Sequence, residues 1–289
     1  MKRFYITDLD HTLLNNKAKL AESSKKKIKL LQKNNIKFTV ATARSFNSVK
    51  YIFEEINLEY PVIELNGAML TGFEDEHHFF VNDIEAAAVK DIVKFSKTIG
   101  FKPFYTVLEE NHSSKLYPPR DKDINAGIQW FIDDRTNNKD PRIIKDKSIT
   151  FDIDADNKVK FISLTFIDKE EKVLELKNYI ENSDNKNKVS MDHFANPYSE
   201  GWQWLSVQSA FTKKGIAINK FKEVLNVKDH EIVVFGDNLN DCNMFEVADR
   251  SYAVENAKEE LKKIATGVIG TNAQDAVLNF ILKENNITY

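Results

Sequence analysis

Two aspartates stand one residue apart directly after an apolar run near the start of the chain. Residues 4–6 have the pattern of a buried strand, and Asp8 and Asp10 follow it. Open α/β sheets place their ligand sites at the carboxyl ends of such strands. Two carboxylates this close repel each other unless a positive group holds them, and Mg²⁺ prefers oxygen ligands. The pair is therefore a candidate metal and catalytic site, and a helix cap beside a solvated carboxylate is the alternative.

Two further strands are predicted to end in small or polar residues. The strands are the apolar runs 36–41 and 61–65, and one helix is predicted before each, over 21–34 and 46–56. This alternation is typical of a parallel, right-handed α/β sheet, in which the carboxyl ends of the strands meet at one edge. The residues that follow the two strands are Thr42, Ala43 and Arg44, then Asn66 and Gly67. We expect them to lie near the aspartate pair.

The same α/β pattern returns near the end of the chain. The predicted elements are helices over 214–225, 257–264 and 273–282, and strands at 231–235, 251–254 and 268–269. Asp237, Asn240 and Asp241 follow the strongly apolar strand at 231–235, and Lys214 begins the first of these helices. These carboxylates therefore follow a predicted strand end, as the first pair does.

The intervening stretch has a different rhythm. Helices are predicted over 84–99, 124–133 and 169–180, and strands at 101–107, 111–117, 149–153, 158–167 and 188–194. Strands joined by hairpin-like links indicate a separate α+β module. We therefore expect one catalytic domain made of residues 1–82 and 191–289, with a cap domain of residues 83–190 inserted into it. A strand at 204–207 is assigned to the catalytic domain.

Composition narrows the class of protein. The chain has 289 residues, of which 42% are hydrophobic and 29% charged, with a net charge of −3. This is typical of a globular protein with a sizeable core, and the absence of a basic excess argues against nucleic acid as a partner. The apolar runs are strand-sized and no signal peptide is recognisable, so we expect no membrane span. The single cysteine, Cys242, excludes an internal disulfide and suits the cytoplasm.

Four stretches resemble the motifs of the haloacid dehalogenase (HAD) superfamily. They are residues 8–13, 41–44, 214–215 and 235–241. Residues 66–68 and 253–257, together with the long insertion, resemble its Cof-type phosphatases, which carry a large α/β cap of type C2. The chain departs from the family where Ala43 and Ala276 stand in place of glycine, and neither change removes a reactive group. The resemblance implies a Rossmann-like core whose cap closes over the site.

The resemblance and the chemistry imply the same division of roles among the aspartates. Cleavage of a phosphate ester needs a nucleophile, a proton donor for the leaving oxygen, and positive charge around the phosphoryl group. Asp8 suits the first role and forms an aspartyl-phosphate, and Asp10 suits the second. The implied cofactor is Mg²⁺, held by Asp8, the backbone carbonyl of Asp10, and Asp237. Asp241 is either a further ligand or a support behind the ligands.

The remaining candidates bind phosphate or substrate. Lys214 is expected to neutralise the phosphate and the nucleophile, and Lys213 is its less favoured neighbour because the family's lysine directly precedes glycine. Thr42 is expected to bond a phosphate oxygen, with a plain helix cap as the alternative. Asn240 is expected to bond the phosphate or to hold Lys214. The weaker candidates for contact with substrate are Ala43, Arg44, Asn66 and Gly67.

The implied function is a Mg²⁺-dependent phosphohydrolase acting on small phosphorylated metabolites, with sugar phosphates as the first expectation. Two alternatives stay open. One is a phosphomutase on the same fold, and the other is a non-catalytic regulatory protein that binds a phosphosugar. The presence of both Asp8 and Asp10 argues against the second alternative, since a binding protein does not need the second carboxylate. We expect a cytoplasmic monomer or weak homo-oligomer.

Overall fold

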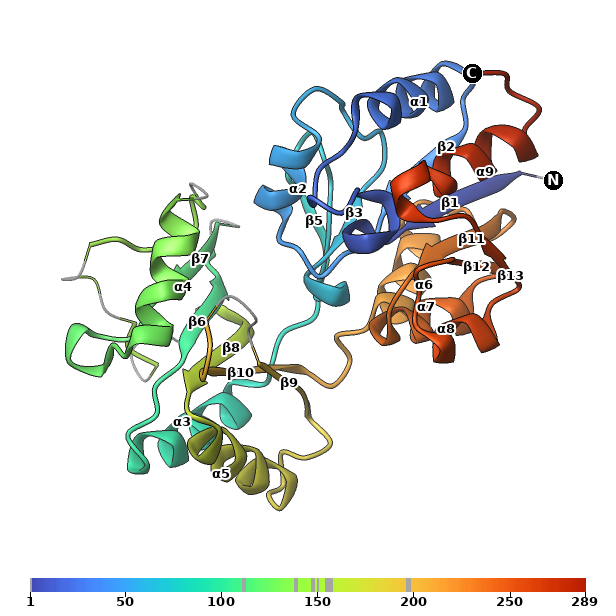
Figure 1. The fold of residues 1–289 in the computed structure, drawn as a ribbon. Helices are drawn as coiled ribbons and strands as arrows, with labels where there is room; N and C mark the ends of the chain where they lie inside the picture. The colour runs from blue at the N-terminus through green and yellow to red at the C-terminus, as the bar shows by residue number, and fades with distance from the viewer. Residues whose placement is uncertain are drawn as a thin grey trace. The chain divides into compact units, whose positions relative to one another are not determined.

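The chain forms two compact units. The structure is a computed structural model and describes residues 2–110, 113–137, 140–146, 149, 151–153, 158–195 and 199–289. Unit 1 combines Met1–Val81 with Thr212–Tyr289, and unit 2 is Asn82–Phe211. The two ends of the chain therefore share one unit, and the middle forms the other (Figure 1). Within these ranges no helix has the length and apolar character to cross a membrane.

A parallel sheet of five strands is the centre of unit 1. Its order is β13-β12-β11-β1-β2. The strands are β1 (Arg3–Thr7), β2 (Lys37–Val40), β11 (Glu231–Gly236), β12 (Arg250–Val254) and β13 (Gly267–Ile269). Strands from the two ends of the chain lie side by side, with Phe4 opposite Ile232. The central strands are buried on both faces, which explains why they read as continuous apolar runs rather than alternating ones.

Helices cover both faces of this sheet. They are α1 (Glu22–Lys33), α2 (Phe46–Ile52), α6 (Lys214–Val224), α7 (Cys242–Val247), α8 (Glu259–Ile264) and α9 (Ala276–Glu284). Short turns of helix, η1 (Leu9–Leu13), η2 (Leu65–Gly67), η4 (Leu239–Asp241) and η5 (Asn272–Gln274), follow the strand ends. Helices α1 and α9 pack together on one side, and α6 to α8 lie on the other (Figure 1).

One predicted strand of the parallel sheet belongs mainly to another sheet. Strands β3 (Val62–Glu64), β4 (Met69–Thr71) and β5 (His78–Val81) form a small antiparallel sheet of their own. The stretch expected as a third parallel strand meets the large sheet only at a parallel bridge between Ala41 and Ile63. This correction leaves the position of the strand end unchanged, because the Thr42 N–H donates to the Ile63 carbonyl (2.8 Å).

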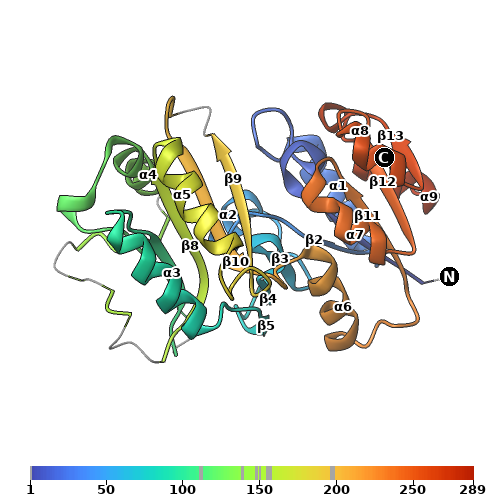
Figure 2. The same cartoon turned by 90° about the horizontal axis from the view of Figure 1, so that it is seen from below.

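Unit 2 is an antiparallel sheet between helices. Its strand order is β7-β6-β8-β10-β9. The elements are α3 (Ala86–Thr98), β6 (Phe104–Leu108), β7 (Ser114–Tyr117), η3 (Asp121–Asp123), α4 (Ala126–Asn137), β8 (Lys160–Asp168), α5 (Glu170–Glu181), β9 (Val189–Ala195) and β10 (Gln203–Ser209). Helices α3 and α5 pack side by side (Figure 2), and apolar residues of α4 form a separate cluster with Trp204. Side chains along β10 point alternately to the two faces of the sheet. Trp204 packs in the cluster with α4, and Leu205 and Val207 pack in the cluster with α3 and α5.

The end of the inserted domain is corrected from residue 190 to Phe211. Strand β10 pairs with β8 and β9, so both β9 and β10 lie in unit 2. The predicted strand at 204–207 is therefore real but belongs to the insertion, because alternation identifies a strand without identifying its sheet. In the expected strand at 149–153, residues 149 and 151–153 are not in a strand and residue 150 lies outside the described residues, as do residues 111 and 112 of the expected strand at 111–117. The predicted fold class, a parallel α/β core with an inserted α+β domain, is confirmed.

Candidate active site

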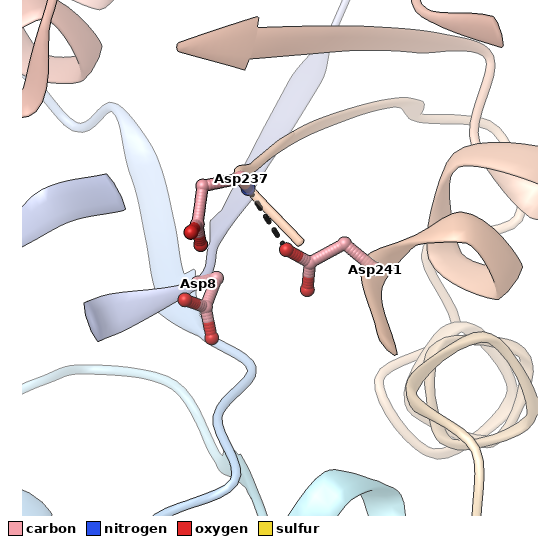
Figure 3. A group of neighbouring side chains, drawn as sticks. All are labelled: Asp8, Asp237 and Asp241. Carbon is pink, nitrogen blue, oxygen red and sulfur yellow. Dashed lines mark hydrogen bonds between the residues drawn. The ribbon is translucent and has the colours of Figure 1, made fainter. Parts of the chain in front are cut away.

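Three carboxylates gather at the carboxyl edge of the parallel sheet. Asp8 follows β1, Asp237 follows β11, and Asp241 ends η4 one turn later. Oxygen atoms of these three side chains lie within 4.8 Å of one another (Figure 3). Strand β11 holds Asp8 in place, because the Asp8 N–H donates to the Phe235 carbonyl (2.9 Å). The expected meeting of the strand ends therefore occurs within unit 1.

Both carboxylate oxygens of Asp241 accept hydrogen bonds from the protein. Its Oδ2 accepts the backbone N–H groups of Asp237 (2.9 Å) and Asn238 (3.1 Å), the first of which is drawn in Figure 3. Its Oδ1 accepts a hydrogen bond from Lys214 (2.7 Å). A side chain at Gly236 would place a Cβ 2.5 Å from Oδ2, so only glycine lets this carboxylate approach the turn. Asp241 thus ties the turn after β11 to Lys214.

Lys214 is completely buried between two carboxylates. Its Nζ donates to Asp8 Oδ1 (2.6 Å) and to Asp241 Oδ1 (2.7 Å). Burial disfavours its charged form, but the two carboxylates outweigh that cost and raise the pKa of Lys214. Lys213, the alternative considered from the sequence, is exposed. The lysine that directly precedes glycine is therefore the one at the site.

Gly67 packs against the start of the helix that carries Lys214. Its φ is +95°, a left-handed conformation that glycine adopts without strain. A Cβ there would lie 2.4 Å from the Lys213 carbonyl oxygen. Gly67, predicted as a substrate contact, thus allows η2 to lie directly against α6.

The site holds more negative than positive charge. Burial raises the pKa of Asp8 to about 7, the charges of Asp241 and Asp237 add to the rise, and Lys214 opposes it. Burial and the charge of Asp241 raise the pKa of Asp237 to about 6, although Thr12 donates a hydrogen bond to it (3.0 Å). Three carboxylates thus face one ammonium group among the described residues of this cluster. A divalent cation would balance that excess, and carboxylate oxygens are the ligands that Mg²⁺ prefers, so the residues fit the ion.

Asp10 lies outside this group of carboxylates. Arg44 grips its side chain with two hydrogen bonds, from Nε to Oδ2 and from Nη2 to Oδ1, both 2.7 Å. A third guanidinium contact, from Nη1, reaches Ser48 (3.1 Å). Arg44, predicted as a substrate contact, is thus bound to the predicted proton donor.

The other candidates shape the loops around the site. The fully buried Thr42 accepts the Arg44 N–H on its hydroxyl (3.1 Å), and its carbonyl accepts the Asn66 N–H (2.9 Å). Ser45, not Thr42, precedes the first residue of α2, so the helix-cap alternative for Thr42 is not supported. Asn240 donates to the Asn66 side chain (3.1 Å), whereas Lys214 is held by Asp8 and Asp241, and exposed Ala43 offers only its backbone.

Two residues without a predicted role, Thr12 and Glu64, support the site. The Thr12 hydroxyl donates a hydrogen bond to the Asp237 carboxylate (3.0 Å). The feature of the sequence that pointed to it was a hydroxyl residue two positions after Asp10. Glu64 is buried at the end of β3, where it accepts the Phe46 N–H at the start of α2 (2.6 Å) and the Thr71 hydroxyl (2.7 Å). Its signal was a charged residue inside an apolar strand, which needs a partner when buried.

Comparison with known proteins decides the family. Residues 5–281 match the family model described as haloacid dehalogenase-like hydrolase. The chain belongs to this family. Phosphatase YwpJ of Bacillus subtilis is 25% identical over 292 residues, covering 95% of this chain and 96% of the relative. A second protein of that organism, 5-amino-6-(5-phospho-D-ribitylamino)uracil phosphatase YwtE, is 27% identical over 286 residues and 95% of each chain.

A solved structure of the same architecture supports the assignment. TM0651 from Thermotoga maritima has a TM-score of 0.76 and 25% identity, covering 100% of this chain and 98% of that one. The match extends over both units of this chain, so the inserted domain is shared as well as the core. The predicted family is confirmed, and so is the prediction of a phosphatase.

Proposed function

We propose that this phosphatase cleaves small phosphate monoesters with Mg²⁺, using Asp8 as a nucleophile and sugar phosphates as its first class of substrate. The observation that carries the proposal is the completely buried Lys214 between Asp8 and Asp241. A buried ammonium beside a carboxylate that ends a strand holds that carboxylate in place for attack and offsets its charge. The relative YwtE supports the substrate class, because its name describes the phosphate ester of a ribityl group.

The chemistry divides between two aspartates. The Asp8 carboxylate attacks phosphorus, a P–O bond forms to Asp8, and the bond to the alcohol oxygen breaks. Asp10 gives that oxygen its proton, then takes a proton from the water that attacks the aspartyl-phosphate and releases phosphate. Lys214 offsets negative charge on Asp8 and on the transferring group. Asp10 can perform its part only after its carboxylate leaves Arg44, so a substrate that draws Arg44 toward itself would free the proton donor.

Asp8 and Asp237 would hold the Mg²⁺ ion, with Asp241 behind them. When bound, the ion offsets charge on the phosphoryl oxygens and on the two carboxylates. The excess of two negative charges in the cluster supports a divalent cation at this position.

The test is phosphate release from a panel of phosphorylated metabolites, with Mg²⁺ and with a chelator, by the wild type and by Asp8→Asn. We expect metal-dependent release that the substitution lowers by at least about a thousandfold, because the amide is not a nucleophile. Circular dichroism checks that the variant is folded. Substantial activity of the folded variant would reject Asp8 as the nucleophile. Interconversion of sugar phosphates without free phosphate would instead support the phosphomutase.

A further inference from the structure

Two asparagines from the end of the chain hold the backbone that follows Asp10. Asn256 lies in the loop after β12, and its side-chain amide donates to the His11 carbonyl (2.8 Å). Asn272 begins η5, after β13, and its amide donates to the Leu14 carbonyl (2.9 Å). Both contacts lie within unit 1, and neither asparagine is among the predicted site residues.

The two asparagines act as a linked pair. The Asn256 side-chain oxygen accepts the backbone N–H of Asn272 (3.0 Å). Asn272 is 4% exposed, and its amide also donates to the side chain of Asn16 (3.0 Å). Asn256 is exposed, so it uses both ends of its amide to bridge two loops at the surface. The pair therefore connects the loops after β12 and β13 to the segment after β1.

The segment that they hold is not a regular turn. His11, directly after Asp10, has a φ of +56°, which is unusual for a residue other than glycine. The turn is wide, because the Leu14 N–H donates to the carbonyl of Leu9 five residues before it (2.8 Å). Backbone in sparsely populated conformations persists when surrounding contacts fix it. The asparagine pair supplies two such contacts, to the carbonyls of His11 and Leu14.

Asp10 thus lies between fixed points on both sides. Before it, the Asp8 N–H is bonded to strand β11 at Phe235. After it, the His11 carbonyl is bonded to Asn256 and the Thr12 hydroxyl to Asp237. A general acid must reach the leaving oxygen at hydrogen-bond distance, and small displacements reduce its contribution steeply.

We propose that Asn256 and Asn272 are positioning residues that hold Asp10 for proton transfer. The inference rests on the proposed function, in which Asp10 protonates the leaving oxygen. Both asparagines bond backbone that follows Asp10, whereas Asp8 is held separately by the Phe235 carbonyl and by Lys214, so the step that needs Asp10 should be affected more than the attack by Asp8.

The leaving group separates this role from simple destabilisation. The sugar of a sugar phosphate leaves as an alkoxide, which needs a proton. The leaving group of 4-nitrophenyl phosphate is 4-nitrophenolate, which is stable without one. The value of kcat/KM reports the steps up to the cleavage of the first P–O bond, so it isolates the part of Asp10 as an acid. The experiment measures kcat/KM for both substrates with the wild type and four variants.

The four variants comprise one benchmark, two tests and one control, each a single substitution in the wild-type protein. Asp10→Ala is the benchmark for loss of the acid. Asn256→Asp keeps the oxygen that faces Asn272 but replaces the donor to His11 with an acceptor, and Asn272→Ala removes the second contact. Asn285→Ala is the matched control, because Asn285 also makes two side-chain hydrogen bonds, to the Tyr5 hydroxyl and the Ile281 carbonyl, at the other edge of the sheet. Thermal unfolding is followed for each protein.

We expect Asp10→Ala to lower kcat/KM for the sugar phosphate by about a hundredfold or more and for the nitrophenyl ester far less. Asn256→Asp should lower the sugar phosphate value by about tenfold and the nitrophenyl value by about twofold or less, in keeping with the loss of one hydrogen bond. Asn272→Ala should show the same selectivity if it folds, and Asn285→Ala should lower only the melting temperature.

Each other outcome has a distinct meaning. Equal losses on both substrates in Asn256→Asp, or no loss, would overturn the positioning role while leaving the proposed function intact. Equal losses on both substrates in Asp10→Ala would reject Asp10 as the acid. That result would overturn both the positioning role and the part of Asp10 in the proposed function. A selective effect in Asn285→Ala would show that selectivity follows from destabilisation, which would also overturn the positioning role.

Discussion

Two charged clusters lie at opposite ends of the same parallel sheet, and they differ in how their charges balance. The carboxyl-edge cluster consists of Asp8, Asp237, Asp241 and Lys214. The amino-edge cluster consists of Arg3, Glu231, Arg250 and Glu284. Three carboxylates face one cation in the first, whereas two carboxylates face two cations in the second. Both are partly or wholly buried, so the contrast is one of charge rather than of position.

The amino-edge cluster has the features of a structural ion network. Glu231 bonds Arg3 (2.9 Å) and Arg250 (2.8 Å), and Arg250 also bonds Glu284 (2.6 Å). The Tyr5 hydroxyl donates to Glu284 (2.7 Å). Although burial works against ionisation, the arginines hold the pKa values of both glutamates below their usual range. This cluster ties α9 to the ends of β1, β11 and β12, and it is complete without any ligand.

The carboxyl-edge cluster lacks this balance between carboxylates and cations. The pKa values of Asp8 and Asp237 rise where those of Glu231 and Glu284 fall, because burial and neighbouring carboxylates outweigh the single lysine. The comparison teaches that a buried cluster with balanced charge supports the fold, and one with an excess of one sign is prepared for a ligand of the other sign.

The largest effect expected from this comparison is on metal dependence. Asp237→Asn removes one negative charge from the carboxyl-edge cluster and leaves the amino-edge cluster intact. The Mg²⁺ concentration for half-maximal phosphate release should rise about 10- to 100-fold. Titration of activity with Mg²⁺ measures it. An unchanged titration would show that Asp237 is not a ligand and that the excess charge has another purpose.

A matched change at the amino edge should affect stability instead. Glu231→Gln removes one charge from the balanced cluster and weakens its bonds to both arginines. The free energy of unfolding should fall by about 1–3 kcal/mol, because the arginines lose a charged partner. Denaturant unfolding measures this loss, and kcat/KM of the folded variant should stay within about twofold of the wild type. A large loss of activity at unchanged stability would contradict the division between the two clusters.

The smallest effect expected is a pH dependence of stability in the metal-free protein. Burial raises the pKa of Asp8 from the ordinary aspartate value of 3.8 to about 7, so the folded state binds this proton more tightly than the unfolded chain does. The contribution of Asp8 is therefore greatest below the unfolded pKa and is lost as the pH rises through about 7. The melting temperature should fall by a few degrees between about pH 5 and pH 7.5, and Mg²⁺ should restore it mainly at the higher pH.

Asp8→Asn provides the control for this titration. Because the amide does not ionise, the variant should lose the part of the pH dependence that comes from Asp8. Calorimetry of the wild type and the variant over the same pH range measures the difference. Identical profiles would mean that Asp8 does not titrate in this range.

The sequence predicted the carboxyl-edge cluster because strand ends of a parallel sheet must meet. Asp8, Asp237 and Asp241 could be assigned to one edge because each follows a predicted strand of the α/β core and because their stretches resemble the family's motifs. The grip of Arg44 on Asp10 could not be predicted, because it depends on side-chain directions in two irregular loops. The residue pattern 253–257 indicated the subfamily, but it did not say that Asn256 would bond the backbone after Asp10.

The end of the insertion was the main error of the sequence prediction. Residues 204–207 alternate as an antiparallel strand should, yet alternation is a local property and sheet membership is not. The three-residue strand at Val62–Glu64 was misassigned for a related reason. A short apolar run beside the parallel sheet fits a bridge as well as a full strand, and only the pairing of Ile63 with Ala41 and Leu70 distinguishes them.

The pairing of β1 with β11 has a consequence for how the enzyme is made. Asp8 and Lys214 are 206 positions apart, so about 10–40 s of synthesis separates their emergence at about 5–20 residues per second. Closing so long a loop costs entropy that only the finished sheet returns, and contacts of such separation slow folding. Residues 82–211, by contrast, are synthesised completely before β11 exists. The nascent chain therefore carries Asp8 long before it carries the lysine that bonds it, and the carboxyl-edge cluster can form only when nearly the whole polypeptide has left the ribosome.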